Sequence, residues 1–551
     1  MINAISSSLV TISALVLAAT PATTMLMVWM TVPFLVGFCI YLLPKFFPKS
    51  DRILALGVVL VSLACGLFLL ISPTTLTLQL LDQFGVNLII DSLSGHFILT
   101  NALVTAAVIG YCWNKQKTAF FYTQTVILHG SVNAVFICAD FISLYVALEV
   151  ISVAAFLLIA YPRTNRSTWV GLRYLFVSNT AMLFYLIGAV LVYQTTHSFA
   201  FEGLAQAPAD AIALIFLGLL TKGGIFISGL WLPLTHSESD TPVSALLSGV
   251  VIKTGVFPLI RCTLLMEEVQ PLLTIFGIGT AVFGVMAAIS AQDTKRMLAA
   301  STMSQLGFLL VAPAAAGLYA LTHGLAKAAL FLTTGVLPSR KFAELRRTPL
   351  PVSLWAVLAI ASLSIAGFPL LAGFAAKTLT LKQLPFWQSL TLTLVSVGTA
   401  IALSKFLFIP LTRASKIAPS HQNALKHPSL NHPDQSANST GHRHIDISFW
   451  IAVGLLIGGL IAANIPYFNL YSPSSLLKAI ITIAIGGLLY WQMSDRHPLL
   501  SQQPLSPSST DSVGVAQSLN VIQKQRVDER LEHLVGGMSL VLVVLFWMVL
   551  A

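Results

Sequence analysis

Apolar segments long enough to cross a lipid bilayer follow one another along almost the whole chain. An α-helix rises about 1.5 Å per residue, so about 20 apolar residues cross the hydrocarbon core. The pattern therefore predicts an all-α protein, a polytopic transmembrane helical bundle with about 14–17 spans. The candidate spans lie near residues 26–45, 52–72, 92–113, 118–138, 140–160, 168–193, 210–230, 241–263, 271–292, 296–312, 315–336, 352–379, 387–411, 448–467, 475–492 and 535–551, with 4–20 as a further candidate.

The amino-acid composition excludes a water-soluble domain. Hydrophobic residues make up 56% of the chain and charged residues only 9%. So few charges cannot cover a water-facing surface, so most of the surface must face lipid. The formal net charge of +10 comes from short basic clusters between apolar segments. These clusters are typical of loops beside a membrane and argue against a nucleic-acid partner.

The basic clusters also predict an orientation. If segment 26–45 runs from outside to inside and every later span alternates, most basic clusters fall in inner loops, as the positive-inside rule requires. The connection after 241–263 is then outer, and it carries Glu267 and Glu268 instead. The inner clusters are Lys45, Lys49 and Arg52; Lys115 and Lys117; Arg163 and Arg166; Lys295 and Arg296; Arg340, Lys341, Arg346 and Arg347; and Arg413, Lys416 and Lys426.

Two long polar segments interrupt the C-terminal part of the chain. Residues 412–447 hold five histidines whose spacing fits no defined metal site, so we expect a solvated loop. Residues 493–534 approach the next span through VIQKQRVDERLEHLV, whose periodicity predicts an amphipathic helix at the membrane surface. The five cysteines form no C-x-x-C pair. Without a phosphate-binding loop, a zinc-protease motif or a nucleophile elbow, we predict no catalytic site, cofactor or metal in this chain.

A small set of ionisable residues stands inside the candidate spans. Such groups cost several kcal/mol at the centre of a bilayer unless they are paired or hydrated, so each is a candidate for function. His323 and Lys327 are four residues apart and therefore share one helix face. The predicted proton relay consists of Glu149, Lys222, Lys253, His323, Lys327 and Lys377.

Lysine is the informative residue type in this set. Burial favours the neutral amine and a nearby carboxylate favours the ammonium, so a buried lysine can hold or release a proton near neutral pH. Arginine cannot do this because it keeps its proton. Simpler explanations stay open for some members. Lys377, like Lys382 and Lys405, could extend to the headgroups, a lone His323 could be structural, and Glu149 could be a structural counter-ion.

Helix-breaking residues accompany two of the lysines. Gly223 and Gly224 follow Lys222, and a second group, Gly367, Pro369 and Gly373, precedes Lys377. Discontinuous helices mark ion sites in transporters because their freed backbone groups line hydrated cavities. Glycine and proline are also common in ordinary membrane helices. The repetition of a break beside a buried lysine favours two discontinuous helices.

At these residues the chain resembles the antiporter-like subunits shared by respiratory complex I, its cyanobacterial and plastid relatives, and the Mrp cation/proton antiporters. The resemblance covers roughly residues 90–410 and is specific in its combination and order of motifs. These motifs are LYVALEV around Glu149, TKGGIFISGLWLPLTHSESDTPVSALLSGVVIKTG from Thr221, DTKRMLAASTMSQLGF from Asp293, HGLAKAALFLTTG from His323, and SIAGFPLLAGFAAKTL around Lys377.

The resemblance implies an arrangement of domains and roles. Two inverted five-helix repeats, each with a discontinuous helix, would occupy 118–263 and 271–411. The N-terminal helices of 1–117 would precede them, and the histidine-containing loop 412–447 and the C-terminal helices of 448–551 would follow. Glu149 and Lys222 would form an ion pair in the first half-channel. Lys253 and Lys327 would bridge to the second half-channel, with His323 beside the path, and Lys377 would be the terminal switch.

Three departures from the family pattern stand out. Arg173 occupies a position where lysine is common, so a switching role there is not expected. Ser248 stands in a region where other members often carry histidine. The sequence SESD at 237–240 replaces the usual short Ala/Pro-type linker.

Four hypotheses for the function follow from the resemblance. The first is a D-type subunit of an Mrp-like Na⁺/H⁺ antiporter, favoured by Lys377 and by the stretch SALLSGVVIKTGVFPLIR. The second is a proton-pumping subunit of a complex I-like quinone oxidoreductase, whose enzyme activity would belong to the assembly. The third is a proton-conducting partner of an inorganic-carbon uptake enzyme. The fourth, a scaffold without transport, is disfavoured because buried charges without a use would be lost.

The resemblance also implies surroundings and partners. The lipid bilayer is the first partner, and the membrane would be a bacterial inner (plasma) membrane or, in a cyanobacterium, the thylakoid. Other membrane subunits of a hetero-oligomeric complex would contact the chain. The transported ions would be protons and, for an antiporter, Na⁺.

Overall fold

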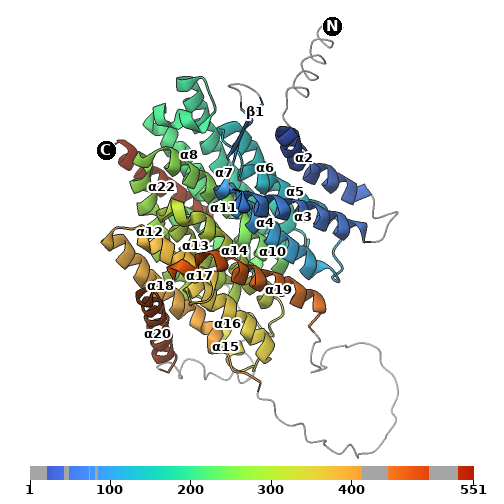
Figure 1. The fold of residues 1–551 in the computed structure, drawn as a ribbon, viewed down its shortest axis with the longest axis vertical. Coiled ribbons are helices and arrows are strands. Elements are labelled where there is room, and N and C mark those ends of the chain that lie inside the picture. The colour runs from blue at the N-terminus through green and yellow to red at the C-terminus, as the bar shows by residue number, and fades with distance from the viewer. Residues whose placement is uncertain are drawn as a thin grey trace, which may run out of the picture.

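Helices make up nearly all of the computed structural model, which describes residues 21–42, 49–72, 75–80, 85–412, 445–495 and 531–550 (Figure 1). Within these residues, eleven helices are long and apolar enough to span a membrane, and three shorter apolar helices accompany them. The predicted multi-pass helical bundle is confirmed. The candidate span 4–20, the histidines of 412–447 and most of 493–534 lie outside the described residues.

The N-terminal helices flank a short β-ladder that the sequence did not predict. The helices are α2 (Pro21–Leu42), α3 (Ser50–Ile71) and α4 (Ser92–Cys112), and the antiparallel strands β1 (Leu76–Gln79) and β2 (Asn87–Ile90) lie between α3 and α4. Gly85, with a positive φ of 125°, stands between the strands. The Asp91 side chain accepts a hydrogen bond from the Ser94 backbone N–H and so caps α4.

The first predicted repeat contains two interrupted helical segments. Its first three helices are α5 (Ala119–Val135), α6 (Phe141–Ile159) and α7 (Asn165–Thr196). The fourth segment breaks into α8 (Ala209–Lys222), η4 (Phe226–Gly229) and α9 (Trp231–Glu238). The fifth runs through α10 (Thr241–Leu246), the π-helical turn η5 (Leu247–Val251) and α11 (Lys253–Leu265).

The second predicted repeat has its broken segment at the same ordinal place. After η6 (Glu267–Val269) come α12 (Gln270–Ser290), α13 (Thr294–Val311), η7 (Pro313–Ala315) and α14 (Ala316–Thr334). The short α15 (Phe342–Leu345) precedes a broken fourth segment made of α16 (Val352–Ala366) and α17 (Ala372–Lys382), and α18 (Phe386–Leu407) follows. Both discontinuous helices that the glycines predicted are therefore present. The inverted symmetry of the repeats stays a prediction.

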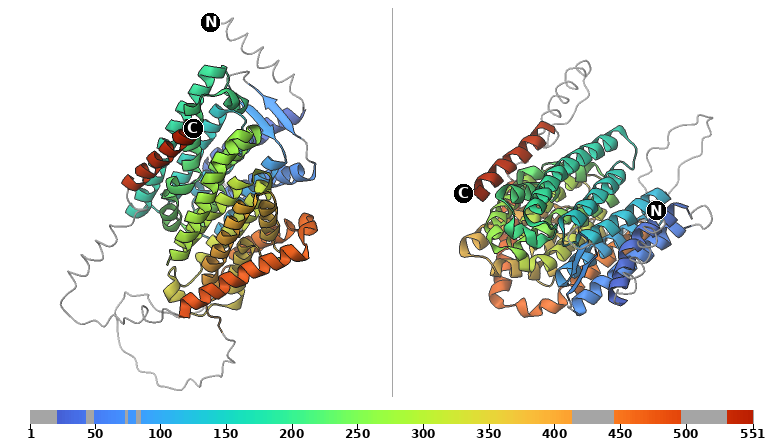
Figure 2. Two further views of the ribbon diagram at one scale, coloured as in Figure 1. Left: turned by 90° about the vertical axis from the view of Figure 1, so that its left-hand side faces the viewer. Right: turned by 90° about the horizontal axis from the view of Figure 1, so that it is seen from above.

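The C-terminal helices pack on both predicted repeats. They are α19 (Ile447–Ala462), η8 (Ile465–Leu470), α20 (Pro473–Asp495) and α22 (Leu531–Leu550). Helix α20 lies along α18, whereas α22 lies against α8 and η4, on the side of the bundle seen in the left view of Figure 2. The two last helices therefore contact different halves of the molecule.

The bundle has a wholly buried centre and a lipid-facing periphery. Every residue of α14 is buried, and so are residues 242–260, which run through α10, η5 and most of α11. Helix α14 packs against α4, α10, α13, α16 and α19. Large apolar side chains are exposed on outer helices such as α2, α7 and α20, as lipid contact requires. The ionisable residues of the predicted relay lie on or beside this buried centre.

Candidate functional site

Five of the six predicted relay residues are buried inside the bundle. Lys253 and Lys327 have no exposed surface, and Lys222, His323 and Lys377 are 3%, 3% and 6% exposed. Glu149 is the exception, because it is only partly buried on α6. Burial of this depth excludes the explanation that Lys377 extends to the lipid headgroups.

Lys222 ends α8 and lies in a small polar site built by two neighbouring helices. Its Nζ donates hydrogen bonds of 2.6 Å to both Ser152 Oγ on α6 and Ser178 Oγ on α7, and one of 3.4 Å to the Leu148 carbonyl. A cation in the last turn of a helix is also favoured by the helix dipole. The sequence analysis did not single out the two serines.

Glu149 does not form the predicted ion pair. The described residues contain no contact within 4 Å between the Glu149 carboxylate and the Lys222 ammonium, although the two charges are close enough to interact electrostatically. Glu149 instead lies between Val146 and Val153 on α6, and both valines are about half exposed. Its side chain therefore belongs to the lateral face of the bundle, with Ser152 one turn further along the helix.

The break after Lys222 depends on glycine. Gly224 has a φ of +65°, a conformation that favours glycine, and a Cβ on Gly229 would lie 2.2 Å from the Gly224 carbonyl oxygen. The Thr221 carbonyl, at the end of α8, accepts a 2.9 Å hydrogen bond from Trp231 Nε1. The broken segment thus keeps one of its terminal backbone groups satisfied inside the bundle.

Lys253 follows the π-helical turn, which presents backbone carbonyls to it. The Ile252 N–H bonds to the Leu247 carbonyl five residues earlier, at 3.1 Å. The Lys253 Nζ donates to the Gly249 carbonyl and, at 3.4 Å, to the Ser248 carbonyl. Turns of this kind are frequent at functional sites, and hydropathy alone does not reveal them. The predicted continuous span 241–263 is therefore helical throughout but locally widened before Lys253.

His323 and Lys327 project from the buried centre of α14. The Lys327 Nζ donates a 3.0 Å hydrogen bond to the Leu298 carbonyl of α13. Neither ring nitrogen of His323 has a hydrogen-bond partner among the residues that the structure describes. His323 lies within electrostatic range of both Lys253 and Lys327. The three groups therefore form a cluster where the two predicted repeats meet.

A small internal cavity joins this cluster to Lys377. The cavity, of about 10 Å³, is lined by nine residues that include Gln305, Tyr319, His323, Ser364 and Lys377. A volume of this size corresponds to about one water molecule. Neither His323 nor the Ser364 hydroxyl has a protein hydrogen-bond partner, so a water molecule there would satisfy polar atoms on both sides.

Lys377 lies in the second broken segment, just past its glycine-containing turn. Its Nζ contacts Ser396 Oγ at 3.3 Å and the Ala366 carbonyl at 3.4 Å. Gly367 has a φ of +91°, and a Cβ on Gly373 would lie 1.8 Å from the Ser364 carbonyl oxygen. Pro369 stands in the turn between α16 and α17. Gly367 therefore lies with Pro369 between the two helices, and Gly373 lies in the first turn of α17.

The remaining charged residues of the spans have other roles. Lys405 donates hydrogen bonds of 2.7 Å to the carbonyls of Ile289 and Ala291 and so caps the end of α12, while Lys382 is exposed at the end of α17. The Arg173 guanidinium lies over the Trp169 ring, 5.7 Å from its centroid. The Ser248 hydroxyl pairs with Thr302 Oγ1 at 2.8 Å.

Polar residues that were not predicted to belong to the relay extend the site along α13. Lys295, Thr302 and Gln305 lie at helical spacing within this mostly apolar helix, and all three are buried. The Gln305 Oε1 accepts a 2.6 Å hydrogen bond from the Tyr319 hydroxyl at the small cavity. His236 on α9 is also fully buried. The helical spacing of Lys295, Thr302 and Gln305 is a signal that the sequence contains.

Comparison with a family model and with curated proteins places the chain among known membrane subunits. Residues 138–402 match the family described as NADH:quinone oxidoreductase/Mrp antiporter, transmembrane. NAD(P)H-quinone oxidoreductase chain 4-2 of a Synechocystis species is 29% identical over 394 residues, which cover 63% of this chain and 70% of that protein. A D-type Na⁺/H⁺ antiporter subunit of Alkalihalophilus pseudofirmus is 26% identical over 385 residues, which cover 63% of this chain and 78% of that protein.

Solved membrane complexes share the fold. A chain of the archaeal membrane-bound sulfane sulfur reductase superposes with a TM-score of 0.66 at 18% identity and covers 83% of this chain and 99% of its own. A chain of the Mrp complex from Dietzia sp. DQ12-45-1b superposes with a TM-score of 0.62 at 19% identity and covers 85% of this chain and 98% of its own. At these identities the likeness is one of fold.

Proposed function

We propose that this chain is the proton-carrying membrane subunit of a multi-subunit complex, in keeping with the match of residues 138–402 to the NADH:quinone oxidoreductase/Mrp antiporter family. The observation that carries this proposal is the buried series Lys222, Lys253, Lys327 and Lys377, which have hydroxyl and carbonyl partners but, among the described residues, no carboxylate in contact. Buried lysines without bound counter-ions are costly, so their use is to gain and lose protons.

The partners of each lysine support a stepwise transfer. Carbonyl and hydroxyl oxygens accept hydrogen bonds from an ammonium, and a hydroxyl can also donate to a neutral amine. A proton that leaves one lysine would lower the repulsion felt by the next, so that protonation of neighbouring sites is coupled. Glu149, within electrostatic range of Lys222, would favour the charged form of that lysine.

We propose the first hypothesis, a D-type subunit of an Mrp-like antiporter, as the assembly. Lys377 and the stretch around Lys253 favour it, as does the similarity to the D-type Na⁺/H⁺ antiporter subunit of Alkalihalophilus pseudofirmus. The alternative, a subunit of a complex I-like quinone oxidoreductase, is favoured by the similarity to cyanobacterial NAD(P)H-quinone oxidoreductase chain 4 proteins at 29–30% identity. In both assemblies this chain would move protons.

A neighbouring subunit is proposed to cover the face of α6. Glu149 is partly exposed between two exposed valines at mid-helix, where lipid contact would be expensive for a carboxylate. A neighbour that presents a polar or basic group would remove this cost. Proton transfer in this chain would then be coupled to the neighbouring subunit through Glu149.

The test of proton movement uses the native complex in proteoliposomes. The measurement is proton flux driven by a pH gradient, followed with a trapped pH-sensitive dye. We expect Lys222→Ala and Glu149→Ala to lose at least about tenfold of the flux while the complex still assembles, because general acid–base groups contribute factors of this size or more. Full flux in both variants would overturn the proposal.

Co-purification separates the assemblies. The tagged chain is purified in mild detergent, and mass spectrometry identifies its partners. Small hydrophobic subunits with a larger antiporter-like chain, and flux that depends on Na⁺, would support the antiporter. Iron–sulfur and quinone-module subunits would support the redox-driven pump. A dedicated soluble enzyme as the main partner would support the inorganic-carbon hypothesis.

A further inference from the structure

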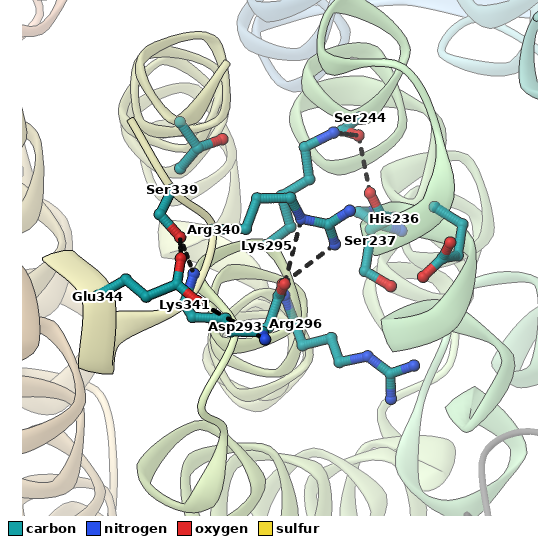
Figure 3. A network of polar contacts seen from close by, with 12 residues as sticks. His236, Ser237, Ser244, Asp293, Lys295, Arg296, Ser339, Arg340, Lys341 and Glu344 are labelled. Carbon is teal, nitrogen blue, oxygen red and sulfur yellow. Dashed lines mark hydrogen bonds and ion pairs between the residues drawn. The ribbon is translucent and has the colours of Figure 1, made fainter. Parts of the chain in front are cut away.

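A charged cleft opens at the end of the bundle where four loops that the alternation of spans predicts to be inner meet. It has a volume of about 890 Å³, and its lining includes Arg166, Glu238, Asp293 and Arg340. Two ion pairs cross it: Arg340 Nε lies 3.1 Å from Asp293 Oδ2, and Arg166 Nε lies 3.6 Å from Glu238 Oε2. Figure 3 shows the Asp293–Arg340 pair beside Lys295. The cleft brings bulk water to the edge of the buried polar residues.

The SESD linker, residues 237–240, reaches this cleft through Glu238, which lines it. Lys295 turns away from the cleft and is 5% exposed. Its Nζ donates a 2.7 Å hydrogen bond to the Ser239 carbonyl and one of 3.2 Å to Ser244 Oγ. Ser244 Oγ in turn donates a 2.7 Å hydrogen bond to the His236 carbonyl. The unusual SESD linker therefore contacts the buried Lys295 through Ser239 and the cleft through Glu238.

His236 on α9 has no exposed surface and lies near Lys295, as Figure 3 shows. Among the described residues no well-formed hydrogen bond reaches either ring nitrogen, and the Leu232 carbonyl one turn earlier on α9 is the backbone group that interacts with the ring. The ring packs against Phe331, with centroids 5.9 Å apart, and Phe331 is one turn beyond Lys327 on α14. His236 is within electrostatic range of both Lys295 and Lys327. A fully buried imidazole without a well-formed hydrogen bond, within electrostatic range of two buried lysines, is more than a packing residue requires.

We propose that His236 is the proton-transfer group that joins the cleft to Lys327, with Lys295 and residues 237–240 as its inner mouth. This inference rests on the proposed function and deepens it. The Lys295 ammonium releases a proton, through water, to one imidazole nitrogen. The imidazolium then releases the proton on its other nitrogen to the neutral Lys327 amine. One N–H bond breaks and one forms at each step, so no oxidant or co-reactant is needed.

The direct test compares two buried histidines in the reconstituted native complex. His236→Gln is expected to lower gradient-driven proton flux at least about tenfold, because glutamine cannot carry a proton between two sites. His129→Gln is the matched control. His129 is equally buried in α5, but its ring bonds to Ser62 and Thr105, and it lies outside the proposed path. Its variant should keep the flux.

A second variant tests the mouth without removing the histidine. Lys295→Arg keeps a cation that can donate to the Ser239 carbonyl, but arginine does not release its proton. We expect a loss of flux similar to that of His236→Gln. Because charge and donors are retained, a folded complex with this loss would separate proton release from structural support.

Chemical labelling locates the mouth. A Glu238→Cys variant is treated with an impermeant sulfonate-bearing methanethiosulfonate, and labelling is expected to cut the flux several-fold because the bulky group fills the cleft. Glu267→Cys is the matched control: Glu267 is exposed and follows α11, at the opposite end of the same buried span. Labelling there should leave the flux unchanged.

The outcomes separate this inference from the function it rests on. If Lys222→Ala does not affect the flux, the proposed function fails and the inference fails with it. If Lys222→Ala abolishes the flux but His236→Gln and Lys295→Arg keep it, only the inference is overturned. The inference is supported if His236→Gln and Lys295→Arg both lose flux and if labelling lowers the flux of Glu238→Cys but not that of Glu267→Cys.

Discussion

The two broken helices solve the same problem with different surroundings. In each, a turn of unusual backbone interrupts an apolar span beside a buried lysine. Lys222 precedes its break and ends α8, so the helix dipole favours its charge. Lys377 follows its break and stands in the middle of α17, without that support.

Lys222 also has closer hydrogen-bond partners than Lys377. Lys222 has two serine hydroxyls at 2.6 Å and a carboxylate within electrostatic range. Lys377 has one serine hydroxyl at 3.3 Å and one carbonyl at 3.4 Å, and lines a cavity of about 10 Å³. We infer that the first site is built to hold a proton and the second to exchange one with a water molecule.

The closest packing at each break predicts the largest effect. A Cβ on Gly373 would lie 1.8 Å from the Ser364 carbonyl oxygen, and one on Gly229 would lie 2.2 Å from that of Gly224. Neither obstacle is a movable side chain, so Gly373→Ala and Gly229→Ala should each cost about 3 kcal/mol or more and reduce assembly. The measurement is the yield and melting temperature of the purified complex.

A glycine in open space gives the control for these variants. Gly454 in α19 has no atom within 4 Å of an added Cβ. Gly454→Ala should be neutral or stabilising by about 0.5–1 kcal/mol. If Gly373→Ala assembles normally, the backbone at the second break can rearrange. The two broken helices would then not be equally constrained by close backbone packing.

Arginine substitution tests whether both lysines release protons. Lys222→Arg and Lys377→Arg should each lower proton flux in proteoliposomes about 100-fold, because arginine keeps its proton. Lys405→Arg is the control, since Lys405 only caps α12 through carbonyl oxygens and an arginine can donate to them as well. If Lys222→Arg keeps its flux while Lys377→Arg does not, the first lysine is a fixed charge.

Removing hydroxyl partners tests how firmly each lysine is held. The double variant Ser152→Ala with Ser178→Ala removes the two short hydrogen bonds of Lys222 and should reduce flux about tenfold. Ser396→Ala removes one 3.3 Å contact of Lys377 and should reduce flux about two- to threefold. Equal effects in the two sites would contradict the distinction drawn between them.

The smallest expected effect concerns the ion pair that fastens the first half at its predicted outer end. Arg261 binds the Asp91 carboxylate through contacts of 2.5 and 2.8 Å. Partial burial opposes ionisation of Asp91, but the hydrogen bonds and charge of Arg261 outweigh it and lower the Asp91 pKa. This stability is therefore present above the ordinary aspartate pKa and is lost as the pH falls through the lowered value.

Asp91→Asn should lower the free energy of unfolding at pH 7 by about 1 kcal/mol, measured as a lower melting temperature. The difference should shrink as the pH falls below the ordinary aspartate pKa of about 3.9. In the second half, Arg346 donates a 2.7 Å hydrogen bond to the neutral Tyr490 hydroxyl. Tyr490→Phe should therefore change stability equally at neutral and acidic pH. A pH-independent loss in Asp91→Asn would show that the pair contributes through packing and not through charge.

Much of the fold could be predicted from the chain alone because lipid imposes a simple rule. Every candidate span within the described residues corresponds to a helix, and the glycines beside Lys222 and Lys377 mark both broken segments. The β-ladder between α3 and α4 could not be predicted, since its strands are four residues each and their partners lie across a turn. Hydropathy carries no signal of that length.

The sequence predicted most of the buried ionisable residues of the candidate site but not their contacts. The buried lysines stood out because charge inside an apolar run is rare. Ser152, Ser178 and His236 did not, because one hydroxyl or imidazole barely changes the hydropathy of a segment. The ion pair expected between Glu149 and Lys222 was wrong because helix rotation places the carboxylate on the lateral face, and periodicity alone does not fix that rotation.

The sequence by itself determined that this chain lies in a membrane, that its helices break twice, and which ionisable groups its spans contain. Composition and the length of apolar segments suffice for that, because backbone groups in lipid must be satisfied within helices. Only the tertiary structure decided which of these groups meet. The π-helical turn before Lys253, the cavity between His323 and Lys377, and the placement of His236 behind Lys295 all depend on packing between helices distant in sequence. No local pattern encodes such contacts.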